Sequence, residues 1–265
     1  QAAAAEWLEL PPYEGCGHGG QLQMVLGLWE RVLPLGGDSD EADAAVFEGE
    51  TPPAPDFHLV DAPTAQLQVA VVHSFLSLAE IQLLDEIGKS PDLEEIDDRS
   101  DSLTYKHHVW RMEKQLKERC KPLYDRLMSA AWGIDGELWD NIDDGTTLYP
   151  EIEYIVYDVA KLGEPGTIHP HRDNQSQVTM VALLSNPEEF QGGINWFEGG
   201  DGPQDVDRCV PLKQGDAVFF FGDQCSHWIT PVVLGRRAIL QMELSAGWPG
   251  CPDALGGWFD WMLCQ

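Results

Sequence analysis

The sequence is poor in basic residues. Its 265 residues include 16 lysines and arginines against 45 aspartates and glutamates, which gives a formal net charge of −29. Proteins that bind nucleic acids neutralise phosphates with lysine and arginine, so this balance argues against a nucleic-acid partner and is compatible with cationic substrates. Solubility or adaptation to a saline host explains the same charge equally well.

Long apolar runs are also absent. No run approaches the roughly 18–20 residues that a membrane-spanning helix needs. The opening stretch Gln1–Ala5 lacks the basic start of a signal peptide. We therefore expect a soluble protein without a membrane span, and the sequence leaves its compartment and its oligomeric state open.

Cysteine is scarce as well. The six cysteines have neither the CxxC spacing of a zinc site nor the density of a disulfide-rich secreted scaffold. Most of them are expected to be buried apolar residues. Cys251 and Cys264 are the best candidates for a disulfide.

The pattern of apolar residues divides the chain into three parts. Residues 1–65 contain twelve acidic residues and one basic residue, and they are predicted to form an acidic extension with one helix, at 20–35, and a linker rich in Gly, Asp, Glu and Pro. Residues 66–246 are expected to form the main domain, and residues 247–265 form a tail that contains Trp and Cys. The sequence has no internal repeat.

The main domain begins with helical patterns and continues with strands. A strand signal at 67–72 precedes a helix that Ser77 caps and that ends at Gly88, and residues 109–132 form an amphipathic helical region that Pro122 kinks or splits. Helices followed by many short strands predict an α+β fold whose second half is a sandwich or jelly roll. The strand signals of that half lie at 152–159, 177–184, 194–198, 217–221 and 238–244.

Two histidines and an aspartate follow a pattern typical of a metal site. His171 and Asp173 are separated by one residue, so on a strand they project to the same face. His227 follows just beyond the strand signal at 217–221. Two histidines and one carboxylate form the facial triad that binds non-haem Fe(II) and leaves positions open for cosubstrate and oxygen. His169 would share the same face and is an alternative ligand, although we favour a non-ligand role for it.

A basic residue near the third ligand fits a dicarboxylate cosubstrate. Arg236 and Arg237 lie about ten residues beyond His227, and a guanidinium binds a carboxylate through two hydrogen bonds. The two arginines project to opposite faces of the predicted strand. Alternation alone does not choose between them, because both faces of a sheet in a sandwich can be covered.

Several stretches of the main domain carry a family resemblance. The segment from His227 to Arg237 fits the pattern H-x(3)-P-V-x(2)-G-x-R, and the other stretches are 71–80, 178–184, 190–197 and 213–220. Residues from about 68 to 246 thereby resemble the 2-oxoglutarate- and Fe(II)-dependent dioxygenases, specifically the prolyl 4-hydroxylase-like branch. The pattern selects Arg237 over Arg236.

The resemblance implies a double-stranded β-helix, or jelly-roll, core with supporting N-terminal helices. It implies Fe(II) bound by His171, Asp173 and His227. It also implies 2-oxoglutarate held through its far carboxylate by Arg237, with Tyr157 as a further contact, O2 as cosubstrate and ascorbate as reductant. The implied reaction hydroxylates a peptidyl (prolyl-like) or amino-acid substrate and releases succinate and CO2.

Some residues depart from the family pattern or leave their roles open. Ile168 and Leu183 stand where many relatives have tyrosines. The aromatic residues Tyr154, Trp196 and Trp228 are candidates for a substrate platform or for core packing. Trp228, next to a predicted ligand, is the best placed of them to face the pocket.

Two alternative functions remain. A nucleic-acid demethylase of the same superfamily has support only from the basic stretch 106–121, which is more simply a solvated helix face, and His107 and His108 within it are expected at the surface. A non-enzymatic cupin-like binding module would not need the complete ligand set and Arg237. The expected partner is therefore a peptide, a protein or a small amine-bearing substrate.

Overall fold

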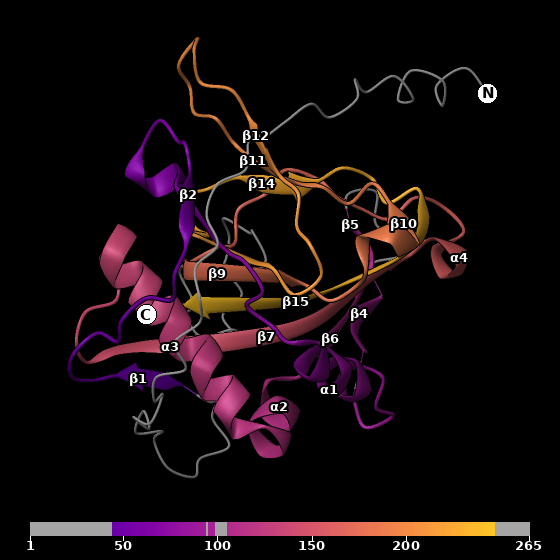
Figure 1. The fold of residues 1–265 in the computed structure, drawn as a ribbon, viewed down its shortest axis with the longest axis horizontal. Helices are drawn as coiled ribbons and strands as arrows, with labels where there is room; N and C mark the ends of the chain where they lie inside the picture. Colours follow the sequence, from indigo (N-terminus) through magenta and orange to yellow (C-terminus); the bar gives the residue numbers. More distant parts are fainter. Residues whose placement is uncertain (1–43, 94, 99–104, 247–265) are drawn as a thin grey trace, which may run out of the picture. The chain divides into compact units, whose positions relative to one another are not determined.

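The fold is described from a computed structural model (Figure 1), which describes residues 44–93, 95–98 and 105–246. The helix predicted at 20–35, the tail at 247–265 and the disulfide predicted between Cys251 and Cys264 lie outside these ranges. The predicted boundaries at residues 65 and 246 therefore stay predictions.

A large antiparallel sheet forms the centre of the domain. Successive side chains of each strand point to opposite faces of the sheet, so each face buries every second side chain. The order across the sheet is β2 (His58–Val60), β3 (Val69–Val72), β13 (Ala217–Phe220), β9 (Ser176–Leu183), β15 (Leu234–Ser245), β7 (Thr146–Asp158), β6 (His108–Arg111) and β4 (Glu95–Asp98), while β1 (Ala45–Phe47) pairs with β7 and β10 (Phe190–Gln191) pairs with β15.

A small three-stranded sheet covers one face of the large sheet. Its order is β12 (Arg208–Val210), β11 (Asn195–Phe197) and β14 (His227–Ile229), and β5 (Tyr105–Lys106) pairs separately with β8 (Thr167–Ile168). Phe197 and Ile229 of the small sheet pack in one apolar cluster with Val181 and Ile239 of the large sheet. Two facing antiparallel sheets with added helices make an α+β fold with a jelly-roll core, as predicted.

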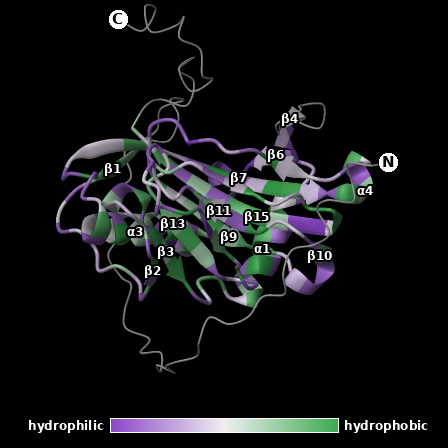
Figure 2. Cartoon of the chain, turned by 90° about the horizontal axis from the view of Figure 1, so that it is seen from above, coloured by the Kyte–Doolittle hydropathy of each residue, from purple (hydrophilic) through white to green (hydrophobic). Residues whose placement is uncertain are grey.

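Helices cover the opposite face of the large sheet. They are α1 (Leu78–Gly88), α2 (Glu113–Arg119) and α3 (Lys121–Leu138), while α4 (Val159–Leu162) and the 3-10 turns η1 (Ala65–Leu67) and η3 (Pro187–Glu189) are connections. Leu84, Leu116 and Leu127 come from the three helices and are 0% exposed, and each such burial contributes roughly 1.5–3 kcal/mol. Hydrophobic residues accordingly concentrate on strands such as β3, β9 and β13 in Figure 2. Among the described helices, none combines the length and the apolar character that a membrane span requires.

The helical region predicted at 109–132 divides differently. Residues 108–111 form β6, whose Val109 pairs with Ile155 of β7, so the prediction of helix at 109–111 is wrong because strand pairing overrides the helical pattern. The break into α2 and α3 falls at Cys120, and Pro122 lies in the first turn of α3, where its missing N–H costs no helix hydrogen bond.

Part of the stretch predicted as a linker packs on the domain. β1 pairs with β7, and β2 pairs with β3. Between these strands the chain lies against α3: a Cβ added at Gly133 would be 2.8 Å from the carbonyl oxygen of Pro52 and 2.9 Å from Cα of Ala54. Gly133 therefore permits a close approach of the two backbones.

The predicted cap of α1 is confirmed. The Oγ of Ser77 accepts a hydrogen bond from the backbone N–H of Glu80 at 3.3 Å, and the Glu80 carboxylate accepts from the backbone N–H of Ser77 at 2.8 Å. This reciprocal capping box satisfies two N–H groups that the first helical turn would leave unpaired. Glu80 also pairs with Arg126 of α3 at 2.9 Å, which ties α1 to the neighbouring helix.

We expect Ser77→Ala to lower the free energy of unfolding by about 1 kcal/mol, because the N-cap acceptor is lost. The measurement is chemical denaturation followed by circular dichroism. Thr64→Ala is the matched control, since Thr64 precedes η1 and makes no side-chain cap hydrogen bond. Equal losses in the two variants would show that the cap of α1 contributes nothing specific.

Candidate functional site

The structure brings His171, Asp173 and His227 together. One donor atom from each residue lies within 4.8 Å of the other two. The Nε2 atom of His171 is 3.5 Å from Oδ1 of Asp173, and the Nε2 atom of His227 is 3.6 Å from Oδ2 of the same carboxylate. The three side chains are thus close enough together to hold a single metal ion as three protein ligands.

Backbone hydrogen bonds position the three residues. The N–H of His171 donates to the carbonyl of His227 at 3.1 Å, and the N–H of His227 donates to the carbonyl of His171 at 2.9 Å. The N–H of Asp173 donates to the carbonyl of Gly222 at 3.1 Å. His227 begins β14 and does not merely follow β13, so the small sheet carries one of the three candidate ligands.

Carbonyl and hydroxyl groups orient the candidate ligands. Nδ1 of His171 lies 2.8 Å from the carbonyl oxygen of His169, and Nδ1 of His227 lies 3.2 Å from that of Cys225. A carbonyl only accepts, so each Nδ1 carries the proton and each Nε2 presents its lone pair to the metal position. The side chain of His169 is exposed and lies outside the convergent group, so His169 contributes its backbone.

Burial sets the ionisation of the site. It lowers the pKa of His171 to about 4, with a smaller effect from His227, and it lowers the pKa of His227 to about 4. Burial also raises the pKa of Asp173, although His171 and a 2.7 Å hydrogen bond from Oγ1 of Thr179 oppose that shift. Both imidazoles are thus neutral at pH 7, which is the form that binds metals.

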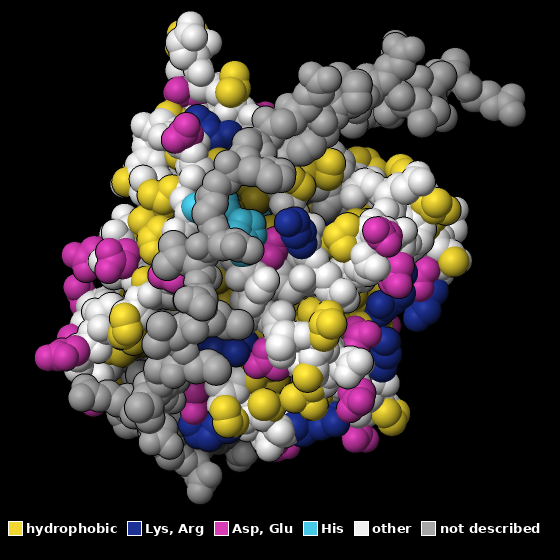
Figure 3. Space-filling view, in the orientation of Figure 1, with side chains coloured by type: hydrophobic (Ala, Val, Ile, Leu, Met, Phe, Trp, Pro, Cys, Tyr) yellow, Lys and Arg dark blue, Asp and Glu magenta, His cyan; other side chains and the backbone are white. Residues whose placement is uncertain are grey.

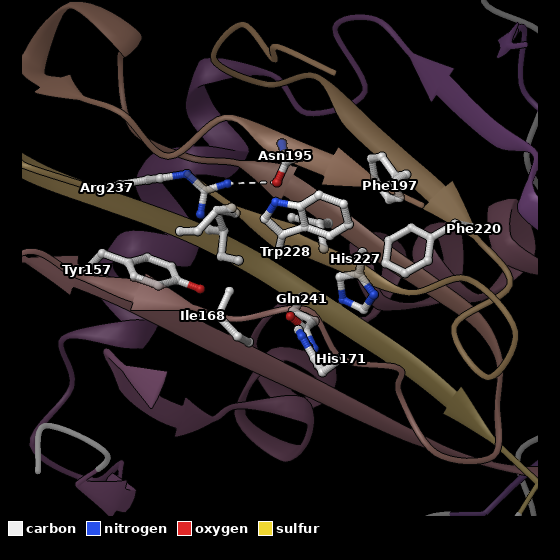
Figure 4. Close-up of a pocket in the computed structure, with 13 residues that line it drawn as sticks. Tyr157, Ile168, His171, Asn195, Phe197, Phe220, His227, Trp228, Arg237 and Gln241 are labelled. Carbon is white, nitrogen blue, oxygen red and sulfur yellow. Dashed lines mark hydrogen bonds between the residues drawn. The ribbon is translucent and has the colours of Figure 1, made fainter. Parts of the chain in front are cut away.

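A cavity adjoins His171 and His227 (Figure 4). Apolar side chains from both sheets form most of the wall, and polar groups are few, as is common in pockets for small ligands. The lining residues beyond the His pair are Tyr157, Ile168, Val181, Asn195, Phe197, Phe220, Trp228, Ile229, Arg237, Ile239 and Gln241.

Arg237 is the buried cation of this cavity. It is 1% exposed, and its Nη2 donates to Oδ1 of Asn195 at 3.0 Å. Nε and Nη1 have no hydrogen-bond partner within the described part of the chain. A buried donor without a partner is costly, and costlier when charged, so the arrangement fits an anionic ligand that accepts from this guanidinium. Burial lowers the pKa of Arg237, and an anion beside it would oppose that effect.

The turn before β11 leaves room for Arg237. Gly193 has φ +67°, and a Cβ added there would lie 2.4 Å from Cδ of Arg237. At the preceding Gly192, with φ +86°, an added Cβ would lie 1.8 Å from the carbonyl oxygen of Pro231. Glycine is therefore required at both positions by conformation and by space.

Arg236 faces the opposite side of β15. Its Nη2 donates to the hydroxyl of Tyr154 at 2.6 Å, and that hydroxyl donates to Asp85 of α1 at 2.7 Å. The structure therefore brings Arg237, and not Arg236, to the cavity. Tyr154 is 1% exposed on the helix-covered face, so it packs in the core and is no part of a substrate platform.

Tyr157 lies in the cavity beside Arg237. The guanidinium carbon of Arg237 is 5.3 Å from the centroid of the Tyr157 ring, and Ile168 lines the same wall. On its other side Tyr157 packs 5.0 Å from the ring of His107. His107 is 0% exposed, so the expectation of a surface position is wrong: the pairing of β5 with β8 folds this segment over Tyr157.

Sequence reasoning missed some of the lining residues. Asn195 and Phe197 share the inner face of β11, and Phe197 pairs in register with His227. Alternation from the predicted strand at 194–198 would have placed both beside the third candidate ligand. Trp228 borders the cavity as expected, and its ring is stacked 6.2 Å from that of Trp196.

Comparisons with known proteins identify the fold. No protein-family model and no curated protein sequence matches this chain. The solved structures that match include prolyl hydroxylases and other 2-oxoglutarate/Fe(II) oxygenases, so the chain has the jelly-roll fold of these enzymes and carries a candidate metal triad within it.

The matching structures differ in their reactions. A Pseudomonas putida prolyl-4-hydroxylase is 15% identical, with a TM-score of 0.50, over 67% of this chain and 91% of that one. A prolyl hydroxylase from Trichoplax adhaerens, solved with a peptide fragment of hypoxia inducible factor, is 14% identical, with a TM-score of 0.51, over 67% and 83% of the two chains. The α-ketoglutarate-dependent epimerase SnoN is 13% identical, with a TM-score of 0.50, over 67% and 76%. At these identities the likeness establishes the fold and leaves the reaction open.

We expect His171 and His227 in the metal-free protein to be neutral at pH 6, with the proton on Nδ1, and to ionise only near pH 4. The reason is burial together with the carbonyl acceptors at each Nδ1. Long-range proton–nitrogen NMR of the imidazoles, assigned with His171→Asn and His227→Asn, measures both properties. A proton on Nε2, or ionisation near the ordinary value of about 6.5, would contradict the geometry.

Proposed function

We propose that the protein is an Fe(II)- and 2-oxoglutarate-dependent dioxygenase that hydroxylates a peptidyl, prolyl-like or amino-acid substrate and releases succinate and CO2. One observation carries the proposal. A single cavity is lined by both histidines of the convergent His–Asp–His set and by a buried guanidinium, that of Arg237, two of whose nitrogens lack hydrogen-bond partners among the described residues. A metal ion and a dicarboxylate would satisfy these two features together.

In this proposal His171, Asp173 and His227 hold Fe(II) on one side and leave the cavity side open. Iron and 2-oxoglutarate, when bound, supply the activation of O2 for insertion into a C–H bond of the substrate, and ascorbate serves as reductant. Thr179 keeps the Asp173 carboxylate oriented through its 2.7 Å hydrogen bond. Because that carboxylate occupies the position that related halogenases leave free for a halide, hydroxylation is favoured.

The inner end of the cavity is suited to the far carboxylate of 2-oxoglutarate. Arg237 would bind it through the nitrogens that lack partners, and Tyr157 would lie beside it. Asn195 holds the guanidinium in place at 3.0 Å. The apolar side chains of Ile168 and Val181 line the space between this end and the candidate metal ligands, and they would exclude water and strengthen the ionic contact.

The substrate class is argued from charge. Support for a nucleic-acid demethylase rested on the basic stretch 106–121, but acidic side chains offset part of its charge: Lys106 pairs with Glu164 at 2.9 Å, and Lys121 with Asp125 at 2.5 Å. On the surface shown in Figure 3, basic and acidic side chains are interspersed. With a net charge of −29, a peptide, a protein or a small amine-bearing substrate is favoured.

We expect His171→Ala and Asp173→Ala to abolish Fe(II) binding and the Fe(II)-dependent conversion of 2-oxoglutarate to succinate, because each removes one of three ligands. Calorimetry measures the binding and mass spectrometry measures succinate. His169→Ala is the matched control, since its backbone carbonyl is kept and its exposed side chain lies outside the convergent group. Full activity in either ligand variant would mean that the metal site is elsewhere.

The same assay separates the alternative functions. A cupin-like binding module would bind metal and form no succinate. A demethylase would remove the methyl group from a methylated single-stranded oligonucleotide; we expect neither turnover nor inhibition by such an oligonucleotide at micromolar concentration.

We expect Arg237→Ala to raise the KM for 2-oxoglutarate by roughly 30-fold or more, because losing one partner of a buried charged contact costs about 2 kcal/mol or more. The KM of Arg237→Lys should lie between those of Arg237→Ala and the native protein, since lysine keeps the charge and loses the two-pronged hydrogen bonding of the guanidinium. Arg236→Ala is the neighbouring control and should change the KM little, with any effect appearing in the melting temperature. The reverse ranking would assign the carboxylate to Arg236.

A further inference from the structure

Three carboxylates extend the cavity-facing side of the large sheet beyond the candidate metal ligands. On β15, Arg237 and Gln241 line the cavity, and alternation places Glu243 on the same face. On β7, Glu153 pairs in register with Gln241, and Glu151 pairs with Glu243. The inner face of the sheet therefore changes from apolar at the end near Arg237 to acidic at the opposite end.

Glu243 lies next to the candidate metal centre. Its register partner on β9 is Thr179, which donates to Oδ2 of Asp173 at 2.7 Å. Nε2 of Gln241 donates to Oε1 of Glu243 at 2.6 Å. One hydrogen bond thus joins Glu243 to the cavity lining, and Glu243 lies directly across from Thr179, the residue that orients Asp173.

The acidic end carries an excess of negative charge. Arg111 of β6 contacts both Glu151 and Glu153, the latter at 3.6 Å. Among the described residues no lysine or arginine forms an ion pair with Glu243. Burial, and then the charges of Asp173, Glu153 and Glu151, raise the pKa of Glu243 well above its ordinary value. A cation placed between these groups would relieve both the burial and the repulsion.

Two independent features mark the adjoining cavity as a place where ligands bind. The candidate metal ligands converge at its wall. Arg237 is 1% exposed and directs nitrogens without partners into it. The carboxylates do not line this cavity themselves, but Glu243 adjoins it through the hydrogen bond from Gln241, which does.

We propose that Glu243 and Glu153 determine the specificity of this site by binding a cationic group of the substrate, an ammonium or a guanidinium. The inference rests on the proposed function and adds the substrate's charge to it. Glu243 is the principal contact, because Arg111 already compensates its neighbours. Holding the cation there places the adjacent carbons of a lysine-like or arginine-like chain beside the metal ligands, and positioning of this kind is a large part of catalysis.

Matched pairs of probes test the proposal. They are L-lysine against L-norleucine and L-arginine against L-citrulline, each free and within a short capped peptide, given to the iron-loaded full chain with 2-oxoglutarate. The gain of one oxygen is measured by mass spectrometry. We expect the cationic member of a pair to show a kcat/KM at least tenfold above that of its neutral counterpart.

Variants locate the preference. Glu243→Gln should reduce the cationic advantage at least tenfold and Glu153→Gln should reduce it less, whereas Glu189→Gln, an exposed residue of η3, should leave it unchanged. Glu243→Lys should turn the preference towards L-glutamate. Melting temperatures identify any variant that fails to fold. If Glu243→Gln fails to fold, the substrate preferences of Glu153→Gln and Glu243→Lys decide whether these carboxylates bind the cation.

Several outcomes would overturn the proposal. One is equal turnover of the paired probes, and another is that no cationic probe accelerates the turnover of 2-oxoglutarate. A cationic advantage that survives both glutamine variants would also overturn it. So would the binding of a second Mn²⁺ ion that is lost in Glu243→Gln, because the carboxylates would then form a metal site. Failure of the proposed function is distinguished in the native protein: there, neither Fe(II) binding nor succinate would be observed with any probe.

Discussion

The candidate site depends on two backbone hydrogen bonds between His171 and His227. They join a loop of the main domain to the first residue of β14, and so they hold together two segments that are distant in sequence. The side chains of the two histidines converge on Asp173 because neither backbone can shift without losing a buried hydrogen bond. Leaving a buried group unsatisfied costs about 1–3 kcal/mol. The small sheet thus serves mainly to deliver one candidate ligand and to close one wall of the cavity.

The same wall explains how a guanidinium can remain buried next to apolar side chains. Asn195 of β11 satisfies one nitrogen of Arg237, and the ring of Tyr157 lies 5.3 Å from its charge. Its other two nitrogens have no hydrogen-bond partner among the described residues, and burial of such a charged group is energetically costly unless an anion compensates it. A cavity of this kind is organised before its ligand arrives, so binding an anion requires little rearrangement of the protein and gains affinity for that reason.

Much of this could be predicted from the sequence. Alternation located the strands that became β7, β9, β13 and β15, and the spacing of His171, Asp173 and His227 predicted residues that do meet. The failures have physical causes. Residues 109–111 are extended because β7 pairs with them, and His107 is buried because a two-residue strand folds it over Tyr157; both effects depend on partners distant in sequence. Alternation could not choose between Arg236 and Arg237 because helices cover one face of β15 and the cavity the other, and only the family pattern selected Arg237.

The two-faced character of β15 limits how this protein can change. One face carries Arg236 to the hydroxyl of Tyr154, which bonds Asp85 of α1, and the other carries Arg237 and Gln241 to the cavity, with Glu243 bonded to Gln241. Inserting or deleting one residue in the strand would exchange the faces, turning the side chains that pack under the helices towards the cavity and burying the cavity's polar groups under the helices. The strand therefore tolerates substitution but not a change of length, so new substrate preferences can arise by single replacements along one face of β15 without disturbing the layer behind it.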